Sequence, residues 1–314
     1  MVWITALIGL AILLVAGDFL VRGAVNLSLR LGIPALIVSL TIVAFGTSAP
    51  EMFISIQGVL EGAPGLSLGN AVGSNTANIL LVLGVPALVS RLHVADFDTR
   101  KSYVPMLGAS CIFIALCALG PIFWVHGLIL LVILALILAD QVRAAMVHRR
   151  TAEAGSVEGA DLEMPGWKIA IFLGLGLVGL PFGADIFVDA AVEIAREFGV
   201  SDSAIGLTLV ALGTSMPELA TTVVAAMRRQ ADVALGNVIG SNMFNILAIV
   251  GVASLFGPMP VPREFLVFDL WVMLGASLLL LPFVFPPKWD LTRRWGTVLT
   301  ILYLLYVGSV VMHG

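Results

Sequence analysis

Residues 41–89 read TIVAFGTSAPEMFISIQGVLEGAPGLSLGNAVGSNTANILLVLGVPALV, and residues 208–256 read TLVALGTSMPELATTVVAAMRRQADVALGNVIGSNMFNILAIVGVASLF. The two stretches align without a gap at an offset of 167 residues, which pairs Glu51 with Glu218. Each copy places a carboxylate inside apolar sequence, where an ionisable group is costly unless it has a partner or a function. The repeated stretch is therefore the main clue to both fold and function.

The composition indicates a membrane protein. Of the 314 residues, 60% are hydrophobic and 11% are charged, and the mean hydropathy is +1.08. These values are too apolar for a water-soluble domain. The formal net charge of −4 is small, and no basic run in the sequence indicates nucleic acid binding. The expected partners are the lipid bilayer and small ions, without nucleic acid and without an obligate protein partner.

Ten apolar stretches are long enough to cross a bilayer, which takes roughly 20 residues of helix. They lie at about 3–22, 33–60, 66–89, 103–120, 123–146, 167–187, 201–227, 231–256, 265–285 and 292–312. The first lacks the basic start of a signal peptide and leads directly into the repeated pattern, so we expect a retained helix. The predicted fold class is an all-α integral membrane protein with ten transmembrane helices.

The placement of arginine and lysine predicts the orientation. If Met1 lies outside, fourteen of the sixteen basic residues fall at inward-facing ends and loops, and only Arg196 and Arg263 face outward. Both termini are then outside and the 148–166 loop is cytoplasmic. This is the arrangement we expect for a multi-pass protein of the plasma, or inner, membrane.

Five predicted helices precede the second copy of the repeat. Because five is odd, the two copies must cross the membrane in opposite directions. We therefore predict two inverted-topology repeats of five helices, residues 1–147 and 167–314, joined by a cytoplasmic linker at 148–166. Inverted repeats are typical of secondary transporters, whose sites lie near the midplane where the halves meet.

Polar groups in the repeats are spaced to share helix faces, since residues three and four positions apart point the same way. Thr47 and Ser48 thus lie beside Glu51. The equivalent groups are Thr214, Ser215 and Glu218 in the second copy, Ser74, Asn75 and Asn78 in the first GSN motif, and Ser241, Asn242 and Asn245 in the second. Pro50 and Pro217 should interrupt their helices and free the carbonyls of Gly46 and Gly213.

A set of carboxylate, hydroxyl, amide and carbonyl oxygens, without sulfur or imidazole, favours a hard cation: Na⁺, Ca²⁺ or Mg²⁺. If Glu51 and Glu218 are both ionised, their charge of −2 would be neutralised by one Ca²⁺ or two Na⁺. When the site is empty the two carboxylates should repel each other, so we expect H⁺ to compete with the metal ions. No cofactor is expected.

Each of these groups also has a purely structural interpretation. The glutamates could form ion pairs, although neither motif contains a lysine or arginine. The hydroxyls could bond to carbonyls of their own helices, and Asn78 and Asn245 could bridge helices. Helix caps or packing groups are the favoured interpretation for Asn70, Asn75, Asn237 and Asn242, and the roles of Asp18 and Asp185 stay open between structure and function.

GTSAPE with GNAVGSNTANILLVLG, and GTSMPE with GNVIGSNMFNILAIVG, resemble the two α-repeats of the cation/calcium exchanger superfamily, in its prokaryotic sodium/calcium exchanger branch. The resemblance implies Na⁺/Ca²⁺ antiport by alternating access, and a first and a sixth helix that slide past the rest. We expect the protein to use the Na⁺ gradient to export Ca²⁺.

The resemblance also implies a ligand set. Glu51 and Glu218 would be carboxylates shared by Ca²⁺ and Na⁺. The other implied ligands are Thr47, Ser48, Ser74, Asn78, Thr214, Ser215 and Ser241, with the backbone carbonyls of Ala44 and Ala211. Asn245 completes the expected site, where some relatives carry an aspartate. Potassium-dependent members resemble the aspartate pattern, so the asparagine argues against K⁺ co-transport.

Two other functions stay open. The paired glutamates could carry protons in a Ca²⁺/H⁺ antiporter, and a Ca²⁺-permeable channel would also place carboxylates in a membrane. Channels, however, usually ring a pore by symmetry among subunits. We do not expect an enzyme, because the serines of the motifs have no histidine or lysine base beside them.

Overall fold

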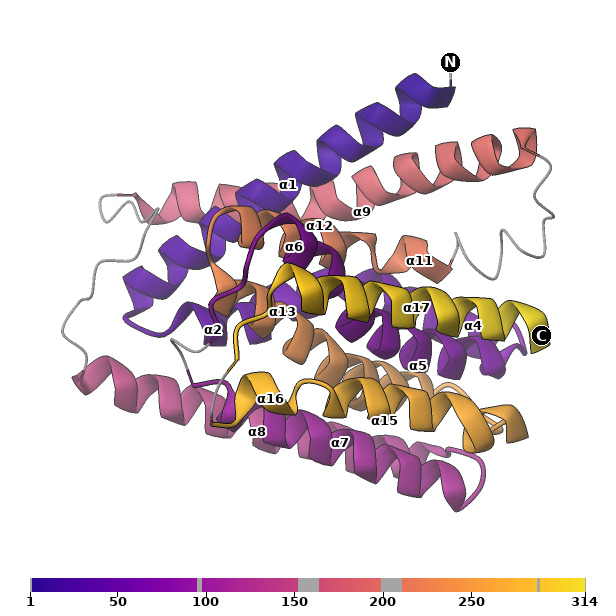
Figure 1. Cartoon of the computed structure of the whole chain (residues 1–314). Coiled ribbons are helices and arrows are strands. Elements are labelled where there is room, and N and C mark those ends of the chain that lie inside the picture. The colour runs from indigo at the N-terminus through magenta and orange to yellow at the C-terminus, as the bar shows by residue number, and fades with distance from the viewer. Residues whose placement is uncertain (1, 95–97, 152–163, 199–210, 287–288, 314) are drawn as a thin grey trace.

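The computed structural model describes residues 2–94, 98–151, 164–198, 211–286 and 289–313, and these are almost entirely helical (Figure 1). The helices of the first half are α1 (Val2–Leu31), α2 (Ala35–Val38), η1 (Ser39–Val43), α3 (Ala44–Thr47), α4 (Ala49–Leu60), α5 (Pro64–Leu80), α6 (Gly84–Val89), α7 (Arg100–Ala118) and α8 (Trp124–Thr151). Those of the second half are α9 (Gly166–Glu197), α11 (Ala211–Thr214), α12 (Met216–Met227), α13 (Ala231–Phe244), η3 (Asn245–Ile249), α14 (Val250–Ala253), η4 (Phe265–Asp269), α15 (Leu270–Leu278), α16 (Leu281–Val284) and α17 (Arg293–His313). The all-helical prediction is confirmed for this part of the chain.

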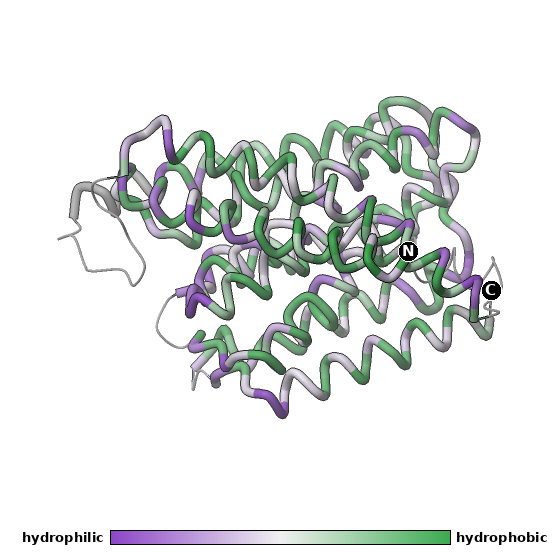
Figure 2. The backbone as a smooth tube through the Cα atoms, turned by 90° about the horizontal axis from the view of Figure 1, so that it is seen from above, coloured by the Kyte–Doolittle hydropathy of each residue, from purple (hydrophilic) through white to green (hydrophobic). Residues whose placement is uncertain are grey.

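Seven continuous helical stretches are long and apolar enough to cross a membrane, and the bent pair formed by 35–47 and 49–60 makes eight. The other two expected spans correspond to α17 and to 201–227, of which the first ten residues lie outside the described ranges. The predicted count of ten therefore stays a prediction. In Figure 2 hydrophobic colour runs along most of the length of the long helices, as expected for surfaces that face lipid.

The chain ends and the middle of the chain lie at opposite ends of the bundle. Figure 1 shows α1 beginning and α17 finishing at one end, whereas α8 finishes and α9 begins at the other. The centre of the bundle is α13 with the following turns, whose side chains are almost all buried. The α13 helix packs against η1, α2, α3 and α12, so the second GSN motif sits in the core of the molecule.

Two helix breaks recur at equivalent positions. Ser48 separates α3 from α4 with φ −86° and ψ 6°, and Ser215 separates α11 from α12 with φ −87° and ψ 2°. Pro50 and Pro217 each lie in the first turn of the helix that follows, where a missing amide proton is tolerated. The first break bends the helix axis by 43°. Both breaks are where the proline positions predict them, but the prediction of a free Gly46 carbonyl is wrong, because that oxygen accepts a backbone hydrogen bond at the end of α3.

The turns after these helices also match. Gly62 after α4 has φ 78°, and Arg229 after α12 has φ 56°, so both residues adopt the left-handed conformation. The closing hydrogen bond recurs, from the Ala63 amide to the Gly58 carbonyl at 2.7 Å and from the Gln230 amide to the Ala225 carbonyl at 2.8 Å. The sequence repeat is thus a repeat of backbone geometry.

Glycines bring α1 and α9 into direct backbone contact along one face of the bundle (Figure 1). A Cβ added to Gly176 would lie 2.6 Å from the Cβ of Leu20, and one added to Gly183 would lie 3.0 Å from the Leu13 amide nitrogen. Larger side chains at these positions would push the helices apart, which is why small residues dominate such contacts in membranes.

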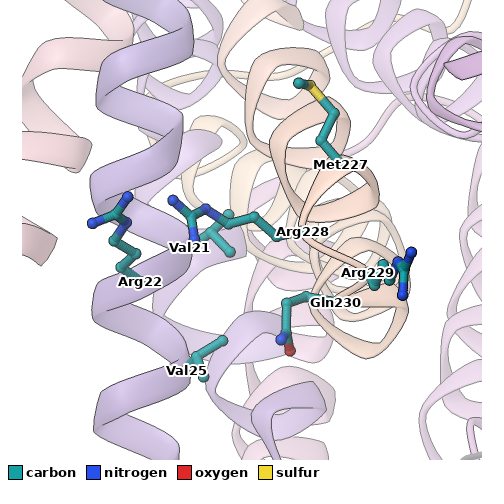
Figure 3. Close-up of a pocket in the computed structure, with 7 residues that line it drawn as sticks. All are labelled: Val21, Arg22, Val25, Met227, Arg228, Arg229 and Gln230. Atoms are coloured by element: carbon teal, nitrogen blue, oxygen red, sulfur yellow. The ribbon is translucent and has the colours of Figure 1, made fainter. Parts of the chain in front are cut away.

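An ion pair ties α1 to the end of α12. The Asp18 carboxylate forms an ion pair with Arg22 on its own helix, at 2.9 Å, and accepts a hydrogen bond from Arg228. Figure 3 shows Arg228 reaching from its turn toward α1, at a small pocket of about 190 Å³. Asp18, whose role the sequence left open, therefore links the first helix to the core.

Candidate cation site

Glu51 and Glu218 lie in the first turns of α4 and α12, directly after the two breaks. Each is 1% exposed. The N-terminal end of a helix favours negative charge, because its free amide groups and macrodipole are positive there. The breaks thus give each buried carboxylate a favourable place in the interior of the bundle.

The two glutamates come from opposite halves of the chain and meet at the centre. The Ser48 hydroxyl, from the first half, donates a hydrogen bond to Oε1 of Glu218 at 3.1 Å, and the Ser241 hydroxyl donates to the same oxygen at 3.4 Å. Two ionised carboxylates in this arrangement would repel each other. Within the described ranges neither glutamate forms an ion pair with a basic side chain.

Several buried polar atoms around this pair have no hydrogen-bond partner among the described residues. They are Oε2 of Glu51, Oε2 of Glu218, Oδ1 of Asn78, Oγ of Ser215, and both Oδ1 and Nδ2 of Asn245. An unsatisfied buried polar atom costs about 1–3 kcal/mol, more if it is charged. Side chains from α4, α5, η3 and the start of α12 therefore present oxygens that lack a partner, as the ligands of a cation site would.

The other expected ligands are placed as follows. The Thr47 hydroxyl donates to the Ala44 carbonyl and to Oδ1 of Asn237, both at 3.3 Å. It therefore bonds to a carbonyl of its own helix, as the structural interpretation predicts. The Ala44 carbonyl also accepts the Ser48 amide, at 3.1 Å. Ser74 and Thr214 line the same pocket, together with Asn70. Ala211 is the first described residue of α11.

The chemistry of this set is that of hard cations. The described residues contain no group of three or more histidine, cysteine, aspartate or glutamate side chains placed to hold a metal ion. The donors are instead two carboxylates with hydroxyl, carboxamide and carbonyl oxygens. Such ligands suit Na⁺ or Ca²⁺ as transported substrates, and a transition metal would require softer donors.

The remaining asparagines bridge helices, as their packing interpretation predicts. Asn70 donates to the Glu51 carbonyl and to Ser55, each at 3.0 Å, and Asn237 makes the equivalent contacts in the second half. Asn75 donates to the Asn242 carbonyl at 3.1 Å, and Asn242 donates back to the Asn75 carbonyl at 3.3 Å. This reciprocal pair joins α5 to α13 directly.

Sequence reasoning missed one wall of the pocket that reaches Ser74 and Thr214. That wall carries Asp269 of η4 with Tyr303 and Tyr306 of α17. The available signal was Asp269 itself, an acid within the apolar stretch 265–285. It lies outside the two repeated stretches, residues 41–89 and 208–256, and so the repeat pattern did not select it.

Most of the chain is similar to known membrane proteins, one of which is named as a sodium/calcium exchanger. The family described as sodium/calcium exchanger protein matches residues 1–142 and 168–312. Sodium/calcium exchanger MaX1 of Methanosarcina acetivorans is 33% identical over 336 residues, which cover 96% of each chain. Inner membrane protein YrbG of Escherichia coli is 34% identical over 277 residues, which cover 87% of this chain and 85% of YrbG.

Solved structures agree with these sequence matches. The sodium-calcium exchanger NCX_Mj, soaked with 10 mM Na⁺ and zero Ca²⁺, superposes with a TM-score of 0.80 at 32% identity, covering 98% of this chain and 99% of that one. Fold, repeated motifs and family match thus point the same way. The chain belongs to the sodium/calcium exchanger protein family.

Proposed function

We propose that the protein is a secondary antiporter that exchanges Na⁺ for Ca²⁺ by alternating access, exports Ca²⁺ and does not require K⁺. The observation that carries the proposal is the meeting of two buried glutamates from opposite halves, with unpartnered oxygens around them. One Ca²⁺ or two Na⁺ would neutralise the two carboxylates. The ligands proposed for these ions are the twelve residues that the sequence predicts.

The proposed architecture is ten transmembrane helices in two inverted repeats, residues 1–147 and 167–314, with a cytoplasmic linker at 148–166. Both termini would face outward from the plasma, or inner, membrane. The recurrence of the helix breaks and turns at an offset of 167 residues supports the repeat. The reciprocal Asn75–Asn242 bonds support an axis of pseudo-symmetry between the halves.

Alternating access requires that one route to the site be closed while the other is open. A Cβ added to Gly236 would lie 2.7 Å from the Leu36 carbonyl oxygen, and one added to Gly240 would lie 2.6 Å from the Ala44 Cβ. This tight contact of α13 with α2 and α3 supports a closed inner route. The pocket beside Ser74, of about 380 Å³, supports an open outer one.

The absence of a K⁺ requirement is proposed from Asn245. Its side chain is buried, neutral and without a hydrogen-bond partner among the described residues. A neutral amide stabilises a bound K⁺ less, electrostatically, than a carboxylate would at the same place. Transport measured with and without K⁺ on both sides tests this point directly.

The test of the main proposal is ⁴⁵Ca²⁺ uptake into proteoliposomes loaded with Na⁺. Uptake should follow the outward Na⁺ gradient and should not be driven by a pH gradient alone, which separates Na⁺ coupling from Ca²⁺/H⁺ antiport. Flux that continues without any counter-ion would instead indicate a channel.

Glu51→Gln and Glu218→Gln test the site. Each should lower Na⁺-driven uptake by more than about tenfold, because half of the negative charge that faces the ion is lost. Glu61→Gln is the matched control, since Glu61 follows the same helix as Glu51 and bonds to Gln57 on an exposed surface. Normal uptake by both site variants would refute the assignment.

A further inference from the structure

The pocket beside the central site has a wall that lies outside the repeated stretches 41–89 and 208–256. Its volume is about 380 Å³, and it lies between α5 on one side and η4 with α17 on the other. The polar groups that line it are Asn70, Ser74 and Thr214, and opposite them Asp269, Tyr303 and Tyr306. Much of the remaining lining is apolar, so these few polar groups dominate its electrostatics.

Asp269 is the one acid that lines this pocket, among the residues that the structure describes. It lies in the apolar stretch Phe265–Val284, which is long enough to span a membrane. Its Oδ1 accepts a hydrogen bond from the Tyr306 hydroxyl at 3.0 Å. Within the described ranges no lysine, arginine or histidine forms an ion pair with it, and Glu264 adds further negative potential. An ionisable residue inside an apolar span, without a basic partner, indicates a functional site.

The facing wall connects Asp269 to the central site. The side-chain amide of Asn70 donates to the Glu51 carbonyl and to the Ser55 hydroxyl, each at 3.0 Å. Its carboxamide oxygen is therefore the polar atom that can face a cation in the pocket. Ser74 lies one turn further along α5, on the same face, and is a proposed ligand of the central ion. The oxygens of Asp269, Asn70 and Ser74 thus line one pocket, and Ser74 belongs to the proposed central site as well.

We propose that Asp269, supported by the Tyr306 hydroxyl, forms a second and weaker cation site in this pocket, where Ca²⁺ or Na⁺ binds before it reaches Glu51 and Glu218. The inference rests on the proposed function for its role in transport. A single carboxylate with few fixed oxygens keeps the ion partly hydrated, so binding is weak and exchange is fast. Negative potential focused in an apolar pocket raises the local concentration of cations and their rate of entry.

Terbium luminescence tests the site directly, because Tb³⁺ is a hard cation that takes the oxygen ligands of Ca²⁺ and is sensitised by nearby aromatic rings. Purified full-length protein in Na⁺-free detergent is titrated with Tb³⁺. Glu218→Gln, which disables the central site, should retain a weak component of sensitised emission. Asp269→Asn combined with Glu218→Gln should lose this weak component. Asp269→Asn alone should lose the weak component and keep the emission from the central site.

Transport kinetics give the second readout. Asp269→Asn should raise the KM for Ca²⁺ by about tenfold, the lower end of the effect of focused charge on local ion concentration, and leave the maximal rate unchanged. Glu264→Gln is the matched control: Glu264 is an exposed acid five residues away that contributes to the potential at Asp269 but does not line the pocket, so its removal should raise KM less. Tyr306→Phe should raise KM less, since it removes only a supporting hydroxyl.

An unchanged KM and unchanged weak Tb³⁺ emission in Asp269→Asn would overturn the proposal. An equal effect of Glu264→Gln would also overturn it, because general surface charge would then explain the result. Failure of the proposed function looks different: wild-type protein would show no Na⁺-driven uptake, while the Asp269-dependent Tb³⁺ emission would persist.

Discussion

Ser48 and Ser215 occupy equivalent positions at the two helix breaks but differ in their contacts. The Ser48 hydroxyl donates to Glu218 at 3.1 Å, whereas the Ser215 hydroxyl is buried and has no partner among the described residues. The repeat is therefore symmetric in backbone but not in hydrogen bonding. One half supplies a donor that holds the carboxylate of the other, and the reverse contact is absent from the described residues.

This difference predicts unequal effects of the same substitution in protein without ions. Ser48→Ala should lower the free energy of unfolding by about 1.5–3 kcal/mol, because it removes a hydrogen bond to a charged group. Ser215→Ala should be neutral or slightly stabilising, since it removes an unsatisfied hydroxyl. Thermal unfolding in Na⁺- and Ca²⁺-free detergent measures both. Equal losses would show that the asymmetry is not present in solution.

Acidification should weaken Ca²⁺ binding. Protons and Ca²⁺ compete for Glu51 and Glu218, which are buried and lack basic partners in the described part of the chain. Each proton displaced by Ca²⁺ adds about a tenfold rise in the apparent Kd per unit fall in pH, by linkage. Calorimetric titration across a pH series measures the slope, and Glu51→Gln should flatten it. A Kd that does not change with pH would contradict shared protonation.

The two carboxylates could be predicted from sequence because a carboxylate costs free energy in apolar surroundings, because both copies of the repeat carry one, and because neither motif contains a basic residue. The hydrogen bond of Ser48 could not be predicted. It joins residues 170 positions apart, and its direction depends on how the two halves approach each other. Spacing along one helix fixes which groups share a face but not which group across the interface they meet.

At the scale of helices, the contact between α1 and α9 depends on the absence of side chains. The Cα of Gly176 faces Leu20 so closely that an added Cβ would lie 2.6 Å from the leucine Cβ. The family resemblance implies that these two helices slide past the rest of the bundle. A smooth contact between them would let them move together.

Gly176→Val should therefore disturb both stability and transport. Overpacking of this kind costs about 1–3 kcal/mol, and a displaced α9 should slow exchange. Gly174→Val is the control two residues away, because Gly174 is exposed and an added Cβ there would meet no described atom within 4 Å. Thermal unfolding and ⁴⁵Ca²⁺ uptake distinguish the pair. Similar behaviour of both variants would argue against a close contact of α1 with α9.

Helix positions and breaks follow from composition and proline, and they agree with the structure over the described residues. The wider turns η1, η3 and η4 were not predicted. Such turns shift hydrogen bonding by one residue without a marker in hydrophobic periodicity, and they often occur at functional sites. Asn245 begins η3 and Asp269 ends η4, so both polar side chains lie at such irregularities.

For the whole molecule, the family and the burial of one glutamate from each half could be predicted from the repeats, because the same motif occurs twice in apolar sequence. The pocket wall of Asp269 and Tyr306 could not, since η4 and α17 lie outside the repeated motifs and meet α5 only through tertiary packing.

The contact between halves predicts that covalent continuity is dispensable. Asn75 and Asn242 bond each other's carbonyls, and α1 packs along α9. Residues 1–147 and 167–314, expressed together as separate chains, should co-purify and restore Na⁺-driven Ca²⁺ uptake. Asn75→Leu should weaken co-purification, and Ser67→Ala, on the same helix, should not. Halves that never associate would show that the linker is needed for assembly.

The pair of hydrogen bonds between Asn75 and Asn242 is self-complementary, because each side-chain amide donates to the backbone carbonyl of the other residue. That is the signature of an isologous dimer interface, in which one surface meets a copy of itself. A half-length ancestor inserted into the bilayer in both orientations would form the same pair of hydrogen bonds in a dimer of two copies. Gene fusion would then have kept an older partnership and freed each copy to specialise, as the two serines at the breaks already have.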